Sequence, residues 1–121
     1  MRKINQKIRD AVETAIVSKT DGRCKFRKAV VAWSKDNIAV CYYGNQVFEY
    51  DKRTGGWWIN NCGWPTAKTR EKVEACMEAV GLPYRYFLKK GEQWLRNIDT
   101  GMTWKCGDGR ITPRDIEFNG L

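Results

Sequence analysis

The chain has 121 residues, of which 42% are hydrophobic and 30% are charged, a composition typical of a folded domain rather than a disordered segment. This length predicts a single domain over residues 1–121 that buries one core. Lys and Arg number 22 against 14 Asp and Glu, and the formal net charge of +8 favours an anionic partner such as nucleic acid. The apolar runs are far shorter than the about 18 residues of a membrane span, so we expect a cytoplasmic protein with no membrane partner.

The residue types that usually carry catalysis or hold metals are sparse. The chain has no His, and its five Cys residues include no Cys-x-x-Cys pair, which argues against a zinc site and for reduced thiols. Without an imidazole, the usual general base near neutral pH is missing, and a Ser or Cys nucleophile lacks its partner. We therefore predict a non-enzymatic protein with no catalytic residues, no metal, no cofactor and no small-molecule substrate.

Residues 3–17 are predicted to form an amphipathic helix. Apolar side chains recur at helical spacing along one stripe, at Ile4, Ile8, Ala11, Val12, Ala15 and Ile16. The first turns carry Arg2, Lys3, Lys7 and Arg9, which oppose the helix dipole. Two interpretations stay open for these cations: a solvated, solubilising surface, or a helix whose positive end faces an anion.

The densest positive cluster of the chain follows that helix. Its cations surround the aromatic ring of Phe26, a combination that a base-stacking or phosphate-gripping loop needs. We expect a loop here, and its candidate nucleic-acid-binding residues are Arg23, Lys25, Arg27 and Lys28.

Beyond residue 28 the pattern of side chains becomes that of short strands. Runs rich in β-branched and aromatic residues, separated by turn residues, occur at 29–33, 38–43, 46–50 and 57–59. Connections this short require antiparallel neighbours. A second group has the same character, at 84–88, 93–98 and 102–105, and Ile111 is a candidate for the start of a last short strand.

A central helix is predicted over residues 66–80. Pro65 cannot continue a strand, and Thr66 is a good N-cap whose hydroxyl can accept the backbone N–H of Thr69. Gly81 and Pro83 are typical of the end of a helix. The apolar stripe of this helix consists of Val73, Cys76, Met77 and Val80.

The start of the central helix is a second candidate anion site. Unpaired N–H groups and the positive end of the dipole attract anions there. The side chains suited to hold a phosphate, which complete our set of candidate nucleic-acid-binding residues, are Thr66, Lys68, Thr69 and Arg70. The alternative is that the threonines only cap the helix and the cations are solvated, with the neighbouring Trp64 a core residue rather than a stacking platform.

The same segment carries a Gly-Trp-x-Thr element, from Gly63 to Thr66, followed by Thr69 and Arg70 at the start of the helix. Together with the strands that begin near Val30, this arrangement resembles a domain of unknown function found in small phage proteins. In that family a strand-rich C-terminal half follows the helix. The resemblance implies a phage origin and no established activity, so it assigns no functional residue.

These observations predict an α+β fold: an antiparallel sheet of about six or seven strands in two meanders, with helices near 3–17 and 66–80 packed on it. Residues 1–28 carry nine Lys and Arg against three acids, and residues 66–90 carry six against three, which suggests one basic face if the two helices are neighbours. We predict a phage-type accessory protein that binds DNA or RNA through this face. The alternative is an inhibitor of a host protein that handles nucleic acid, such as a CRISPR effector, acting by protein–protein contact.

Overall fold

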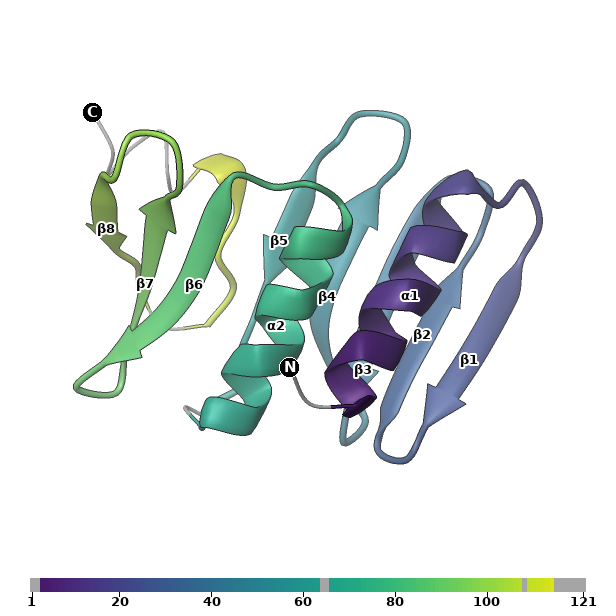
Figure 1. The fold of residues 1–121 in the computed structure, drawn as a ribbon, viewed down its shortest axis with the longest axis horizontal. Coiled ribbons are helices and arrows are strands. Elements are labelled where there is room, and N and C mark those ends of the chain that lie inside the picture. The colour runs from purple at the N-terminus through teal and green to yellow at the C-terminus, as the bar shows by residue number, and fades with distance from the viewer. Residues whose placement is uncertain (1–2, 64–65, 108, 115–121) are drawn as a thin grey trace.

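The computed structural model describes residues 3–63, 66–107 and 109–114 of the chain. Its helices and strands make an α+β fold, which confirms the predicted class (Figure 1). The elements are, in chain order, α1 (Lys3–Val17), β1 (Gly22–Phe26), β2 (Ala29–Trp33), β3 (Asn37–Tyr42), β4 (Asn45–Asp51), β5 (Trp57–Ile59), α2 (Ala67–Ala79), β6 (Tyr84–Lys89), β7 (Glu92–Asn97) and β8 (Thr103–Lys105).

The strands form two antiparallel meanders (Figure 1). In the five-stranded sheet β1 to β5 pair in sequence order, and β6 to β8 form a three-stranded sheet in the same way. One row across the larger sheet aligns Cys24, Val31, Val40, Phe48 and Ile59. Because directly opposed residues point to the same face, this apolar row belongs to the inner face of the sheet.

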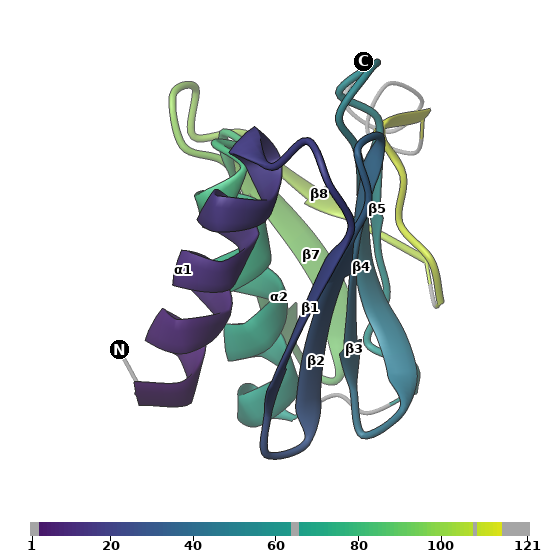
Figure 2. The ribbon, with the colours of Figure 1, turned by 90° about the vertical axis from the view of Figure 1, so that its right-hand side faces the viewer.

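Both helices cover that inner face and run parallel to each other (Figure 2). Asn5 Nδ2 donates to Glu71 Oε2 at 3.1 Å, and one turn further along, Arg9 Nη1 lies 2.8 Å from Glu78 Oε1. These contacts advance in the same direction along both helices. The N-termini of α1 and α2 therefore lie at the same end of the molecule.

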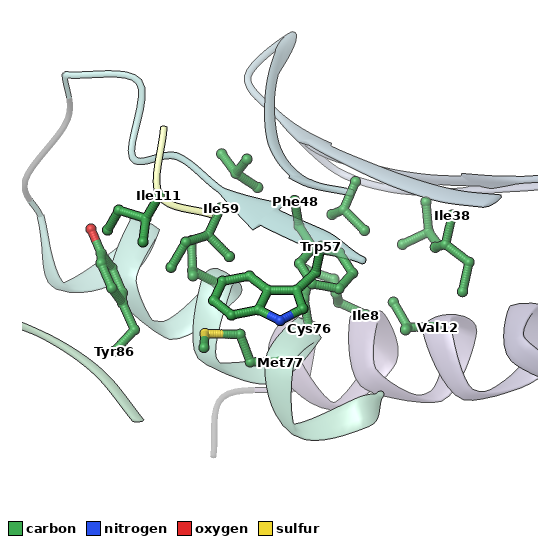
Figure 3. Packing of buried hydrophobic residues seen from close by; sticks show 14 of the residues in the cluster. Ile8, Val12, Ile38, Phe48, Trp57, Ile59, Cys76, Met77, Tyr86 and Ile111 are labelled. Atoms are coloured by element: carbon green, nitrogen blue, oxygen red, sulfur yellow. The ribbon is translucent and has the colours of Figure 1, made fainter. Parts of the chain in front are cut away.

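The core fills the space between the helix layer and the larger sheet and extends to the second sheet (Figure 3). Ile8 of α1 and Cys76 and Met77 of α2 have no exposed surface. Their completely buried partners from the sheet are Val31, Ile38, Val40, Phe48 and Ile59. Complete burial of an aliphatic or aromatic side chain contributes about 1.5–3 kcal/mol, so this cluster is the main stabilising feature of the fold.

A buried polar network fixes the segment that follows β8. The Tyr86 hydroxyl donates to Gln93 Oε1 at 2.7 Å, and Gln93 Nε2 donates to the carbonyl oxygens of Gly107 at 2.9 Å and Gly109 at 3.1 Å. Held in this way, the segment returns to the larger sheet, where Ile111 forms an isolated antiparallel bridge with β5.

The cationic segment that was expected to be a loop is the edge strand β1. Arg23 and Lys25 are exposed, whereas Cys24 and Phe26 pack against the core, an alternation with the period of a strand. Exposed cations are common on edge strands because they discourage pairing with another chain. Phe26 is therefore a partly buried residue packed against the core, and the cations beside it belong to a strand rather than to the expected loop.

The two predicted helices are confirmed as α1 and α2, with Thr66 as the N-cap and Val80 as the C-cap of α2. The predicted strands correspond to β2 to β8, divided between two sheets. The predictions for Arg2, Trp64 and Pro65 lie outside the described residues. Within the described ranges, no helix is long and apolar enough to cross a membrane.

Candidate functional site

Cationic segments that are distant in the sequence meet at one end of the molecule. The N-termini of α1 and α2 lie at this end (Figure 1). So do the turn that joins β1 to β2, at Arg27 and Lys28, and the turn that joins β3 to β4, at Tyr43 and Gly44. The candidate residues from β1 and from the start of α2 are thus brought to the same part of the surface.

Three adjoining depressions cross this end. The first, of about 540 Å³, lies between the start of α1 and the end of β1, and its lining includes Lys3, Lys7 and Arg27. The second, of about 170 Å³, shares Arg27 with the first and extends to Lys68. The third, of about 550 Å³, shares Lys68 with the second and lies between the β3–β4 turn and the start of α2. Each depression thus adjoins the next through the residues they share, and we call the three together the path.

The path is strongly cationic. Its lining contains no Asp or Glu among the described residues, and seven Lys and Arg side chains. We call these seven residues the basic end: Lys3, Lys7, Lys25, Arg27, Lys28, Lys68 and Lys72. Within the described part of the chain, Lys3, Lys7, Lys25, Arg27 and Lys68 form no ion pair with an acid. Their charges are therefore not neutralised by described neighbours.

The two helix dipoles add to this positive field. Neither α1 nor α2 has an acidic residue in its first turn or a basic residue in its last turn. A helix N-terminus carries roughly half a positive charge, which a first-turn Asp or Glu would offset. Two such ends beside seven cations produce a region that attracts anions.

At the start of α2 the two threonines have a capping role. Thr66 Oγ1 accepts the backbone N–H of Thr69 at 3.3 Å, as predicted, and lies 3.2 Å from Thr69 Oγ1. Thr69 is only 4% exposed, so its hydroxyl mainly serves the helix start. Lys68 is exposed and lines both the second and the third depression.

Two of the candidate residues from the sequence lie outside the path. Arg23 projects from β1 opposite Ala32 and lines none of the three depressions. Arg70 Nη1 lies 2.8 Å from Glu74 Oε2, on a part of α2 that carries further acids. Burial raises the pKa of Glu74 above its usual range, although the Arg70 charge opposes that shift. The Arg70 charge is thus largely balanced by this carboxylate.

Two tyrosines lie along the path. The rings of Tyr42 and Tyr43 meet edge to face with their centroids 4.7 Å apart. Lys72 Nζ lies 5.2 Å from the centre of the Tyr42 ring, and Lys28 Nζ lies 5.9 Å from that of Tyr43. Tyr43 nevertheless has 63% of its surface exposed.

Sequence reasoning omitted Lys3, Lys7, Lys72 and Tyr43 from the candidate set. Lys3 and Lys7 have a signal in the sequence, since they are cations in the first turns of a helix. Lys72 also has one, because it follows Lys68 by four residues and so lies on the same side of α2. Tyr43 has no such signal, because its place depends on how the β3–β4 turn meets α2.

Metal ligands do not gather in the described part of the structure. No group of three or more His, Cys, Asp or Glu side chains there could hold a metal ion. The five cysteines are all free thiols. Burial raises the pKa of the Cys76 thiol far above its usual range and also raises that of Cys62.

Comparison with known proteins places the chain in a family. A search of curated proteins finds no match, and a search of solved structures also finds none. The family model of the Kyanoviridae Gp96 protein matches residues 1–111, a range that contains the whole basic end. This match supports the phage origin that the resemblance implies, while it does not test the element from Gly63 to Arg70. The chain belongs to the Kyanoviridae Gp96 protein family, and is thus a phage-encoded protein.

Proposed function

We propose that this phage protein is a non-enzymatic accessory protein that binds nucleic acid through its basic end. The observation that carries the proposal is the path of three adjoining depressions, lined by seven cations and by no acid among the described residues. Lys and Arg contacts to phosphate oxygens supply most of the affinity of nucleic-acid-binding proteins and do not depend on base sequence.

The origin of the cations distinguishes the basic end from an ordinary solvated charge run. Lys3 and Lys7 come from α1, Arg27 and Lys28 from the β1–β2 turn, and Lys68 from α2. Folding brings these like charges together, and their mutual repulsion opposes it. A polyanion that lies along the path relieves this repulsion at several positions together.

We rank the candidate residues by their place relative to the path. Lys28 and Lys68 line the middle of the path, so we expect the largest effects from them. Arg70 is paired with Glu74, and Arg23 lies outside the path, so each is expected to contribute less. Thr66 contributes as the cap of the helix start, and Thr69 as the residue whose backbone N–H this cap accepts.

Salt-dependent binding of fluorescently labelled oligonucleotides tests the proposal. Dissociation constants for single-stranded DNA, duplex DNA and RNA are measured by fluorescence anisotropy between about 50 and 200 mM salt. A protein that contacts about five phosphates shows a slope of log K against log salt of about −4. The Lys28→Ala/Lys68→Ala double variant is expected to reduce the magnitude of that slope by about 2 and to weaken binding.

A matched double variant controls for net charge. The α1–β1 connection and the β2–β3 turn lie at the opposite end of the molecule (Figure 1), and they contain the exposed Lys19 and Lys35, respectively. Lys19→Ala/Lys35→Ala removes the same charge and is expected to leave the slope unchanged. Equal effects of the two double variants would refute a role of the basic end. An absence of binding at low salt would refute nucleic-acid binding and favour contact with a host protein.

A further inference from the structure

The third depression differs in character from the rest of the path. It has a volume of about 550 Å³, and Lys68 is the one cation among its described lining residues. Ligand pockets of proteins have volumes of about 300–1,000 Å³, with mainly apolar walls and a few polar groups. Here Tyr42, Tyr43 and Val47 supply the apolar wall, and Asn45 and Thr66 supply polar groups. The depression is large enough for a planar heterocycle.

Tyr43 occupies a backbone conformation that disfavours its side chain. Tyr43 has a φ of 51° and Gly44 a φ of 77°, and together they form the two-residue turn between β3 and β4. Turns of this kind favour Asn or Gly at the first position, because left-handed backbone crowds a bulky side chain. The fold therefore holds an aromatic ring in solvent at a position where a smaller residue would be more stable.

The neighbours of Tyr43 keep its ring in place and leave most of it open. Tyr42 contacts it edge to face, and Lys28 Nζ lies 5.9 Å from its centre. With 63% of its surface exposed, the ring can still stack on a ligand. Asn45 is exposed, and its Nδ2 donates to the carbonyl oxygen of Tyr43 at 3.3 Å. The side-chain oxygen of Asn45 takes no part in this hydrogen bond.

The cations that adjoin the depression fit the backbone of the same ligand. Lys68 lines both the third depression and the second, which also contains Lys28 and Lys72. A nucleotide whose base stacks on Tyr43 can thus place its phosphates beside the exposed Lys28 and Lys68, whereas Lys72 is only 2% exposed. In a duplex the bases are stacked and paired, so only an unpaired base can enter in this way.

Building on the proposed function, we infer that the third depression binds an unpaired base, and that the ligand of this protein is single-stranded nucleic acid. Tyr43 is the stacking platform, and the basic end holds the adjacent phosphates. Stacking on an aromatic side chain tolerates any base, because every base has a π-face. Single strands are therefore bound more tightly than duplexes of the same length, with little preference for sequence.

Substitution of Tyr43 separates stacking from charge. Tyr43→Asn removes the ring and supplies a residue that the left-handed turn favours, so the variant is expected to fold. Its affinity for a single-stranded oligonucleotide is expected to fall about 5- to 100-fold, while the salt slope and the affinity for duplex stay the same. Tyr43→Phe keeps the ring and is expected to restore most of the affinity. Ile98→Ala is the matched control, because it removes an apolar side chain that is 56% exposed outside the path.

A fluorescent base reports the contact directly. The fluorescence of 2-aminopurine in a single-stranded oligonucleotide is expected to change when the wild type binds, and the change is expected to disappear with Tyr43→Asn. If salt-dependent binding persists but Tyr43→Asn binds single strands as tightly as wild type, the base pocket is refuted and the proposed function stands. Equal affinity of the wild type for single strands and duplex also refutes the pocket. If no oligonucleotide binds at low salt, the proposed function fails and the pocket fails with it.

Discussion

Replacement of Gln93 by Met is expected to cause a large loss of stability, because it removes the centre of a buried hydrogen-bond network. Tyr86 and Gln93 are only 1% and 3% exposed. Gln93 accepts from the Tyr86 hydroxyl and donates to the carbonyl oxygens of Gly107 and Gly109. Met fills a similar volume but can neither donate nor accept in this way, so three polar groups lose a partner.

The size of the loss follows from the exposure of those groups. A buried polar group left without a partner costs about 1–3 kcal/mol. Gly107 is exposed, so its carbonyl oxygen can bind water instead, and the Tyr86 hydroxyl retains a hydrogen bond with the Asn61 side chain. We therefore expect Gln93→Met to lower the free energy of unfolding by about 2–4 kcal/mol. For a domain of this size that corresponds to a fall in Tm of roughly 10 °C.

Urea denaturation followed by Trp fluorescence and circular dichroism measures this loss by linear extrapolation. Tyr86→Phe and the double variant Tyr86→Phe/Gln93→Met complete a double-mutant cycle. The double variant is expected to cost less than the sum of the single variants, because Phe leaves no orphaned hydroxyl. Burial raises the pKa of Tyr86 well above its usual range, so the hydroxyl stays neutral and the coupling is expected not to vary between mildly acidic and neutral pH. A loss below about 0.5 kcal/mol for Gln93→Met, or strict additivity, would refute the role given to this network.

Three further predictions address the fold and its titration. Gly22→Ala is expected to destabilise the protein by about 1–3 kcal/mol in urea denaturation, because a Cβ at Gly22 would overlap the indole ring of Trp33; an unchanged midpoint would show that the ring moves aside freely. Burial raises the folded-state pKa of Glu74 above its unfolded value, so the native state binds the proton more tightly and stability falls as pH rises between these two pKa values. Glu74→Gln is expected to remove this fall. If the free energies of unfolding of the variant and the wild type differ by a constant amount between about pH 4 and 7, the prediction is wrong. Iodoacetamide at neutral pH is expected to leave Cys76 unmodified until the protein unfolds, since burial raises the pKa of its thiol and closes access; mass spectrometry of the native protein checks this.

The fold could be predicted from local signals wherever those signals were undisturbed by charge. α2 begins directly after Thr66 and ends before Gly81, as expected, because helix capping and termination depend on a few neighbouring residues. In β1 the exposed cations Arg23 and Lys25 alternate with less exposed residues such as Cys24. This strand pattern was missed because the segment was interpreted by its charge. The division into two sheets was not predictable, because it depends on long-range pairing such as the bridge between Ile111 and β5.

The candidate site was predictable in part for the same reason. Lys68 and the β1–β2 turn were identified from local charge, and the structure places them on one path. The pairing of Arg70 with Glu74 follows a spacing of four residues along a helix, a signal that the sequence contained and our candidate set did not use. The position of Tyr43 beside the start of α2 depends on the strand register and on helix packing, which no local pattern specifies.

The distribution of charge over the two helices argues that the basic end is maintained against stability. Away from the path of depressions, cations of the two helices are matched with acids: Arg9 pairs with Glu13 and Glu78, and Arg70, at the end of the first turn of α2, pairs with Glu74. At the helix starts the opposite holds, since cations accumulate where the dipoles already make the potential positive and where an Asp or Glu would stabilise each helix by about 0.3–1 kcal/mol. Proteins seldom depart from local stability rules without a compensating interaction elsewhere. Here an anionic ligand is the interaction that would compensate both helix starts together, because both open onto the same path of depressions.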